Sequence, residues 1–115
     1  MDNGAVHLAL LVCPAIALLI VCLAIPLAMG KIKRNPWYGF RTPRTLSSDE
    51  IWYSANRSAA VNMIVAGILI WVVAALLYVM KDQMPSQTVV IVMAGFTFAA
   101  MVFAVVKSFM SLSKS

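Results

Sequence analysis

The sequence predicts an all-α membrane protein with three transmembrane helices and no soluble domain. Of the 115 residues, 63% are hydrophobic and only 11% are charged, which is more apolar surface than a soluble domain of this length buries. Three stretches, residues 5–29, 59–80 and 88–106, contain no Asp, Glu, Lys or Arg. Each is close to or above the about 20 helical residues that cross a hydrocarbon core, and a backbone in lipid must satisfy its hydrogen bonds internally. We therefore expect one membrane domain over residues 1–115.

Basic residues are unevenly divided between the segments that follow each span. Six of the nine Lys and Arg residues lie between spans one and two, only Lys81 lies between spans two and three, and Lys107 and Lys114 follow the third span. Because positively charged segments stay in the cytoplasm, the first loop and the C-terminus are expected inside and the N-terminus outside. Span one is expected to be retained rather than cleaved as a signal peptide, since no Lys or Arg precedes it and a basic cluster follows it.

The segment between spans one and two, residues 31–58, is cationic and aromatic, and we call it the cap; its sequence is KIKRNPWYGFRTPRTLSSDEIWYSANRS. In its first half Asn35-Pro36 and Thr42-Pro43 flank Gly39. Residues before proline avoid the helical region, so this half is predicted to be a turn-rich, extended loop.

The second half of the cap is predicted to be an amphipathic helix that starts at Ser47. Glu50 stands three residues later, as in a capping box, and Leu46 and Ile51 have the spacing of a hydrophobic staple. Over residues 48–58 the helical period places Trp52 and Asn56 on one face. This helix is expected either to continue into span two or to bend close to it.

The basic residues of the cap outnumber its acids, Asp49 and Glu50, by six to two. Such a cluster beside a membrane helix attracts anionic lipid at ~1 kcal/mol per residue. We therefore expect Lys31, Lys33 and Arg34 to set the topology and to contact anionic lipid headgroups.

Arg41 stands apart from the other basic residues because it lies in a loop constrained by Gly39 and two prolines. Two interpretations are open. In one, Arg41 forms an internal salt bridge with Asp49 or Glu50 that holds the loop to the helix. In the other, its planar guanidinium faces a ligand such as a carboxylate or phosphate.

Polar and small residues within the spans predict contacts between helices. Asn62 enters the inner leaflet, where a buried amide usually bonds a neighbouring helix. The pairs Gly95-x-x-x-Ala99 and Ala100-x-x-x-Ala104 have spacings that let helix backbones approach. Packing within one bundle is the favoured interpretation, and an oligomer is the alternative.

The sequence offers little for catalysis. Its only histidine, His7, and its cysteines, Cys13 and Cys22, are expected on or near the opposite side of the membrane from the acidic pair of the cap. No catalytic triad, metal-ligand spacing or glycine-rich phosphate loop is recognisable. We expect a protein that is not an enzyme and that has no cofactor, no metal site and no nucleic-acid partner.

The run from Asn35 to Ser47, NPWYGFRTPRTLS, followed by Glu50, Trp52 and Asn56, resembles the signature of the SdpI family. In that family N-x-x-(aromatic)-G-(apolar)-R-T-P leads to a serine-started helix with W-x-x-x-N. The signature covers about a fifth of the chain, and the three spans resemble the C-terminal region of longer members that carry additional N-terminal membrane helices.

The resemblance implies a protein of the bacterial inner membrane. The member that gave the family its name protects its producer against a secreted, membrane-active peptide toxin, and it also holds a transcriptional repressor at the membrane. A peptide toxin or a cytoplasmic regulator is thus an implied partner. Binding or cap-forming roles are expected for a set of cap residues, namely Asn35, Trp37, Gly39, Arg41, Thr42, Pro43, Glu50, Trp52 and Asn56.

Two other functions are compatible with the sequence. In a membrane adaptor, the excess of cations in the cap would dock a soluble partner or an anionic ligand. A small transporter is disfavoured, because the spans contain no ionisable residue that could couple to an ion.

Overall fold

The apolar stretches form three long helices, α1 (Asn3–Ala28), α2 (Asp49–Met80) and α3 (Ser86–Ser113). The computed structural model describes residues 3–113, and Lys114 lies outside them. Two short 3-10 turns, Thr45–Ser47 and Lys81–Gln83, complete the regular structure of the described residues, all of which is helical. Each long helix is long and apolar enough to span a membrane, so the predicted class of all-helical protein with three spans is confirmed.

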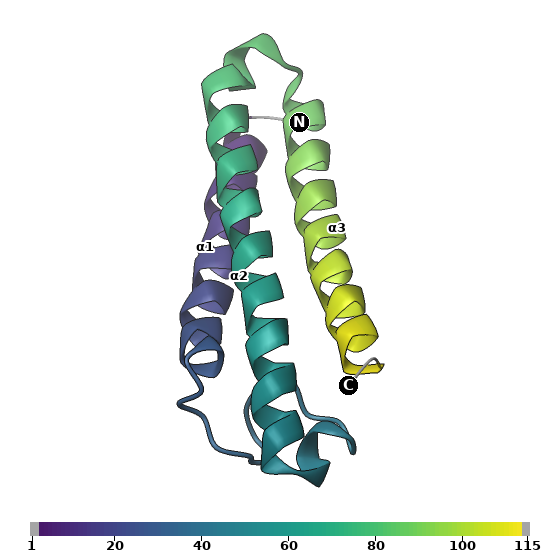
Figure 1. Ribbon diagram of the computed structural model, residues 1–115. Helices are drawn as coiled ribbons and strands as arrows, with labels where there is room; N and C mark the ends of the chain where they lie inside the picture. Colours follow the sequence, from purple (N-terminus) through teal and green to yellow (C-terminus); the bar gives the residue numbers. More distant parts are fainter. Residues whose placement is uncertain (1–2, 114–115) are drawn as a thin grey trace.

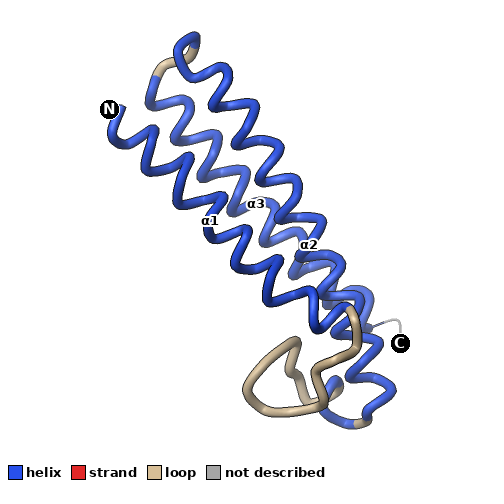
Figure 2. The backbone as a smooth tube through the Cα atoms, turned by 90° about the vertical axis from the view of Figure 1, so that its left-hand side faces the viewer, coloured by secondary structure: helices blue, strands red, loops and turns tan. Residues whose placement is uncertain are grey.

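The three helices lie side by side in an elongated bundle 52 Å in its longest dimension (Figure 1). A short hairpin joins α2 to α3 at the end where the chain begins. The loop of the cap and the end of α3 lie at the opposite end (Figure 2). The loop that carries most of the basic residues and the C-terminal end of α3 therefore share one end of the bundle.

Helix α1 ends in a Schellman motif built on Gly30. The Gly30 N–H donates to the Leu27 carbonyl at 3.2 Å, and the Lys31 N–H donates to the Pro26 carbonyl at 3.0 Å. This motif requires a left-handed residue, and Gly30 has φ +71°. The turn stops the helix and directs the chain into the cap.

The structure corrects the predicted start of the second helix by one residue. Ser48, not Ser47, is the N-cap, and its Oγ accepts a hydrogen bond from the Ile51 N–H at 3.2 Å. Ser47 instead closes the preceding 3-10 turn, where its hydroxyl donates to the Arg44 carbonyl. With the cap at Ser48, Glu50 is one residue short of the capping-box position, so that box and its staple are wrong.

The amphipathic helix of the cap is not a separate element. It is continuous with span two, because α2 runs unbroken from Asp49 to Met80. Helix α3 likewise extends beyond the predicted residues 88–106. Helical hydrogen bonding needs no apolar side chains outside lipid, so an apolar run gives the minimum length of a spanning helix rather than its ends.

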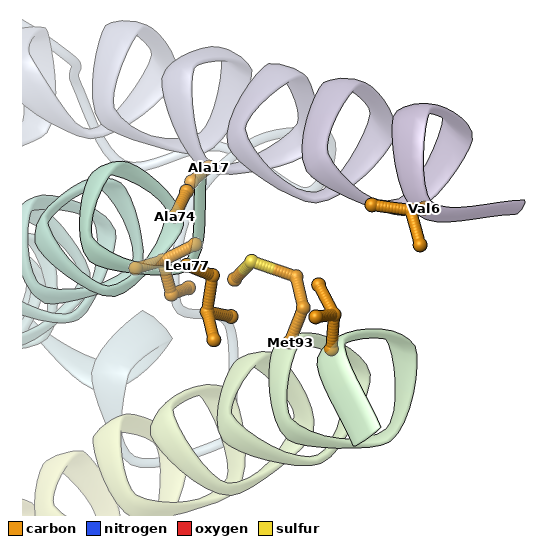
Figure 3. Close-up of a cluster of buried hydrophobic side chains, with 7 residues drawn as sticks. Val6, Ala17, Ala74, Leu77 and Met93 are labelled. Atoms are coloured by element: carbon orange, nitrogen blue, oxygen red, sulfur yellow. The ribbon is translucent and has the colours of Figure 1, made fainter. Parts of the chain in front are cut away.

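Helix α2 is the central element, since it packs against both α1 and α3. A buried cluster joins the three helices in the half of the bundle near the hairpin (Figure 3); it consists of Val6, Ala17, Ile70, Ala74, Leu77, Val89 and Met93. The outward faces carry exposed Leu, Val, Ile and Phe side chains. An apolar exterior around a small interior is what lipid solvation of the spans requires.

Small residues bring α1 and α2 together, but only part of the predicted small-residue packing lies inside the bundle. A Cβ at Gly67 would collide with the Val21 side chain. Ala104 is buried and Ala100 packs against the core, as predicted. Gly95 and Ala99 are exposed instead, with nothing within 4 Å of a Cβ added at Gly95, so packing of that pair within the bundle is wrong.

The close approach at Gly67 generates a stability prediction. Gly67→Val will separate α1 from α2 and destabilise the protein by about 1–3 kcal/mol through overpacking. Thermal unfolding of the purified protein in detergent should show a lowered Tm. Gly95→Val is the matched control and is expected to leave Tm nearly unchanged, because that position is open. Equal Tm values for the two variants would contradict the close approach.

Candidate functional site

Trp52 anchors the loop half of the cap to the first turns of α2. It is fully buried at 0% exposure, and its indole N–H donates to the Ile32 carbonyl at 2.9 Å. A buried indole usually finds such a partner for its polar end. This bond joins two points 20 residues apart in the sequence and brings the start of the loop onto the helix.

Asn56, one helical turn after Trp52, holds the middle of the loop. Its Oδ1 accepts from the Phe40 N–H at 2.6 Å, and its Nδ2 donates to the Phe40 carbonyl at 3.3 Å and the Trp52 carbonyl at 3.0 Å. The side chain is 2% exposed. One amide thus satisfies both backbone groups of Phe40, as a neighbouring strand would, and leaves none of its own groups unpaired.

Gly39 is required where the loop passes over α2. Its φ of +109° is unfavourable for residues with a Cβ. A Cβ at Gly39 would lie 2.7 Å from Asn56 Oδ1, 3.1 Å from Leu27 Cδ2 and 3.3 Å from Trp52 Cη2. Glycine therefore lets the loop backbone sit between α1 and α2 against the two anchoring side chains.

Asn35 builds the first turn of the loop from its own side chain. Its Oδ1 accepts from the Trp37 N–H at 2.8 Å and the Tyr38 N–H at 2.7 Å, and its Nδ2 donates to the Lys33 carbonyl at 2.6 Å. This Asx turn folds the chain back towards α1. The Tyr38 hydroxyl then donates to the Leu23 carbonyl, inside α1.

The second turn rests on a pair of threonines. The Thr42 N–H donates to Thr45 Oγ1 at 2.7 Å, and the Thr45 N–H donates to Thr42 Oγ1 at 3.1 Å. Pro43 follows Thr42 and lies before the 3-10 turn that begins at Thr45, so its missing N–H costs no hydrogen bond within that turn. Sequence analysis overlooked Thr45, which is fully buried; the reciprocal spacing in Thr-Pro-Arg-Thr is the signal that identifies it.

The predicted salt bridge of Arg41 is wrong. Its guanidinium donates to the Pro36 carbonyl and, through Nε, to the Gly39 carbonyl at 3.4 Å, and it pairs with neither acid of the cap among the described residues. Arg34 takes the expected place instead: its Nε lies 3.4 Å from Asp49 Oδ1, and its Nη1 donates to the Leu46 carbonyl at 3.2 Å. Arg41 thus braces the loop from within.

The predicted site residues therefore divide into two groups. One group holds the loop in place through side-chain or backbone contacts, namely Asn35, Gly39, Arg41, Thr42, Trp52 and Asn56. Arg34, predicted to contact lipid headgroups, also belongs to this group through its contacts with Leu46 and Asp49. The other faces outward, namely Trp37, Pro43, Glu50, Lys31 and Lys33. Trp37, at 84% exposure, is the most prominent member of the second group.

Two contacts connect the cap and the adjoining part of α2 to α3. The rings of Phe40 and Phe109 meet edge to face with centroids 4.9 Å apart. Further along α2, Asn62 Nδ2 donates to Ser108 Oγ of α3 at 3.1 Å, which confirms the predicted hydrogen bond between helices. The loop of the cap therefore touches all three helices, at Leu27 of α1, Asn56 of α2 and Phe109 of α3.

The family of the chain follows from this segment. The model of the SdpI/YfhL protein family matches residues 31–108, which is more than half of the chain. The chain belongs to the SdpI/YfhL family. In this SdpI/YfhL protein the match begins with the cap and continues through α2 and most of α3. Its three spanning helices make it a multi-pass membrane protein. No curated protein and no solved structure matches the chain.

The described part of this SdpI/YfhL protein contains no group of three or more His, Cys, Asp or Glu side chains that could hold a metal ion. Cys13 and Cys22 are free thiols of α1. The chemistry that the cap presents outward is cationic and aromatic, which suits anionic or amphipathic molecules.

A substitution at Gly39 tests the packing of the cap. Gly39→Ala is expected to cost about 2 kcal/mol or more, from the positive φ and the close approach of Asn56. Hydrogen–deuterium exchange should then accelerate at residues 31–48 while α3 stays protected. Gly30→Ala is the matched control: it also has a positive φ, but its Cβ would meet only Arg57 Nη2 at 3.6 Å. Unchanged exchange in Gly39→Ala would contradict this packing.

Proposed function

We propose that this chain is a non-enzymatic immunity protein of the bacterial inner membrane that protects the cell against a membrane-active peptide toxin. The first loop and the C-terminus lie in the cytoplasm, and the N-terminus lies outside. Membership of the SdpI/YfhL family and the gathering of six basic residues in the cap support this proposal.

The observation that carries the proposal is the way in which the signature residues close one end of the bundle. Trp52, Asn56 and Gly39 bring the loop onto α1, α2 and α3 at once. A cap attached to every helix fixes how the spans pack at that end, and therefore which span surfaces face the lipid. Those surfaces are where a toxin within the bilayer meets the protein.

Protection is therefore expected to depend on the integrity of the cap. Arg41→Ala removes the bonds to the Pro36 and Gly39 carbonyls, which should destabilise the loop by about 1.5–3 kcal/mol, the range for hydrogen bonds to a charged group, and so lower the survival of toxin-challenged cells. Sensitive bacteria that express each variant would be challenged with a panel of membrane-active peptide toxins, with membrane abundance measured in parallel.

Arg44→Ala is the matched control for this experiment, because Arg44 is an exposed arginine of the same loop. It should protect as well as the unmodified protein. If Arg41→Ala protects fully at equal abundance, the cap is not needed for immunity. If the unmodified protein protects against no toxin of the panel, the proposed function is wrong.

A membrane adaptor is the second candidate, and the outward group of cap residues favours it. Trp37 is the most exposed large apolar side chain of the described residues, and Lys33 and Arg44 are exposed close to it in the sequence. Exposed aromatic and arginine side chains are typical of surfaces that bind another protein.

The adaptor function makes its own prediction. A photoreactive amino acid at Trp37 or Arg44 should capture a cytoplasmic protein in living cells. The same group at Trp71, on the apolar outer face of α2, should give only lipid adducts. Lipid adducts alone at all three positions would contradict the adaptor.

A further inference from the structure

An apolar cavity of about 360 Å³ lies beneath the cap, between the last turns of α1 and α3. Its lining includes Leu23 and Leu27 of α1, Ala60 and Met63 of α2, and Val105 and Phe109 of α3. The loop closes its cap end with Gly39 and Phe40. The cavity thus runs along the helices from the cap into the membrane-spanning part of the bundle.

The cavity opens sideways. Its floor on α2 is buried, with Ala60 at 2% exposure, whereas Leu23 is 48% and Phe109 51% exposed. Polar side chains of the lining, Asn56 and Ser108, already have partners: Asn56 bonds Phe40 and Ser108 donates to the Ala104 carbonyl at 2.7 Å. An occupant of this groove therefore has to be apolar along its length.

One basic side chain lies next to the cap end of the groove. Arg41 Nε lies 3.4 Å from the carbonyl of the lining residue Gly39. Arg41 belongs to the cationic loop that closes this end, and it pairs with neither acid of the cap among the described residues. An anionic group at this end of the groove would therefore meet a cation.

The loop lies along α1 at this end of the groove. The Tyr38 hydroxyl bonds the Leu23 carbonyl, five residues before α1 ends, so the loop folds back along the helix instead of standing away from it. Tyr38 and the exposed Trp37 are residue types that lie at the level of lipid headgroups. The basic residues around them are therefore placed where lipid phosphates lie.

We propose that this groove is a binding site for an anionic glycerophospholipid, with one acyl chain between α1 and α3 and its phosphate beside Arg41. The acyl chain would pass beneath the rings of Phe40 and Phe109 and fill the space over Ala60. The bound lipid would complete the packing between α1 and α3 at the end of the bundle that the apolar core near the hairpin does not reach.

The lining of the groove suits a lipid chain. It consists of apolar side chains from all three helices and the loop, and its walls on α1 and α3 are exposed. A flexible acyl chain can follow such an irregular apolar wall. Charge complementarity at the cap end then selects an anionic headgroup.

A second groove in the same molecule provides an internal comparison. It measures about 480 Å³, lies on α1 and α2 near the hairpin, and is lined by residues such as Leu18 and Trp71. Lys81 lies over the ring of the lining residue Tyr78, and its Nζ is 3.5 Å from Asp82 Oδ1. This groove is apolar as well, yet it lacks an excess of cations and should show no headgroup preference.

Photocrosslinking in vesicles tests the proposal. The full chain would be reconstituted in phosphatidylcholine vesicles that contain a small share of diazirine-labelled phosphatidylglycerol or, in parallel, diazirine-labelled phosphatidylcholine. Adducts mapped by mass spectrometry should favour phosphatidylglycerol about fivefold at Met63, Met101 and Val105, the ratio that one basic residue contributes near an anionic group. Adducts at Leu18 and Trp71 should show no preference.

Filling the groove should abolish these adducts. Ala59→Phe places a ring in the cavity, which Ala59 lines, and should reduce adducts at Val105 to the level of the surrounding helix faces. Ala99→Phe, an exposed position of α3 outside both grooves, is the matched control and should leave them unchanged. Hydrogen exchange of α2 shows whether each variant is folded.

Two results would overturn the proposal. Adducts spread evenly over the lipid-facing surfaces of α1 and α3 would show that the groove holds no particular lipid. Equal labelling of the groove by the two lipids would show that the cations of the cap do not select an anionic headgroup. Neither result depends on whether the protein confers immunity.

Discussion

The N–H and the carbonyl of Phe40 are both hydrogen-bonded to the buried side-chain amide of Asn56, and the architecture of the cap depends on this interaction. Non-helical backbone close to lipid is tolerated only where its polar groups are satisfied inside the protein. Asn56 provides this on α2, Gly39 gives the loop the room to reach it, and Trp52 brings the start of the loop to the same face. With the Phe40 backbone held there, its ring reaches Phe109 and joins the loop to α3.

The spans and the face of α2 that holds the loop were predictable from the sequence, and the path of the loop was not. Uncharged stretches of this length have to be helices in lipid, and Trp52 and Asn56 share a face because they are one turn apart. Ser47 and Ser48 are chemically equivalent candidates for an N-cap, and only the geometry of the preceding Thr42–Thr45 turn selects the second. The partner of Asp49 likewise depends on where the loop travels: Arg34 reaches it, although Arg41 is nearer in sequence.

The structure changes what the family signature implies about function. Its most distinctive residues, the glycine, the arginine, the tryptophan and the asparagine, are engaged in contacts within the cap. A signature of this kind describes how one end of the bundle is closed. The side chains that the closed cap leaves on its outside, such as Trp37 and the basic residues near it in the sequence, are the ones exposed to other molecules.

Because α2 is continuous, the number of residues between two positions on it matters as much as their identity. The same unbroken helix carries Asn56, which holds the loop, and Gly67 and Ile70, which pack in the bundle. Adding or deleting one residue between positions 56 and 67 would rotate the two groups by about 100° and shift them by 1.5 Å relative to each other. Asn56 would then turn away from Phe40 although every side chain of the cap remained present. The spacing along this helix is therefore part of the information that specifies the fold, and insertions or deletions there are as disruptive as the loss of the asparagine itself.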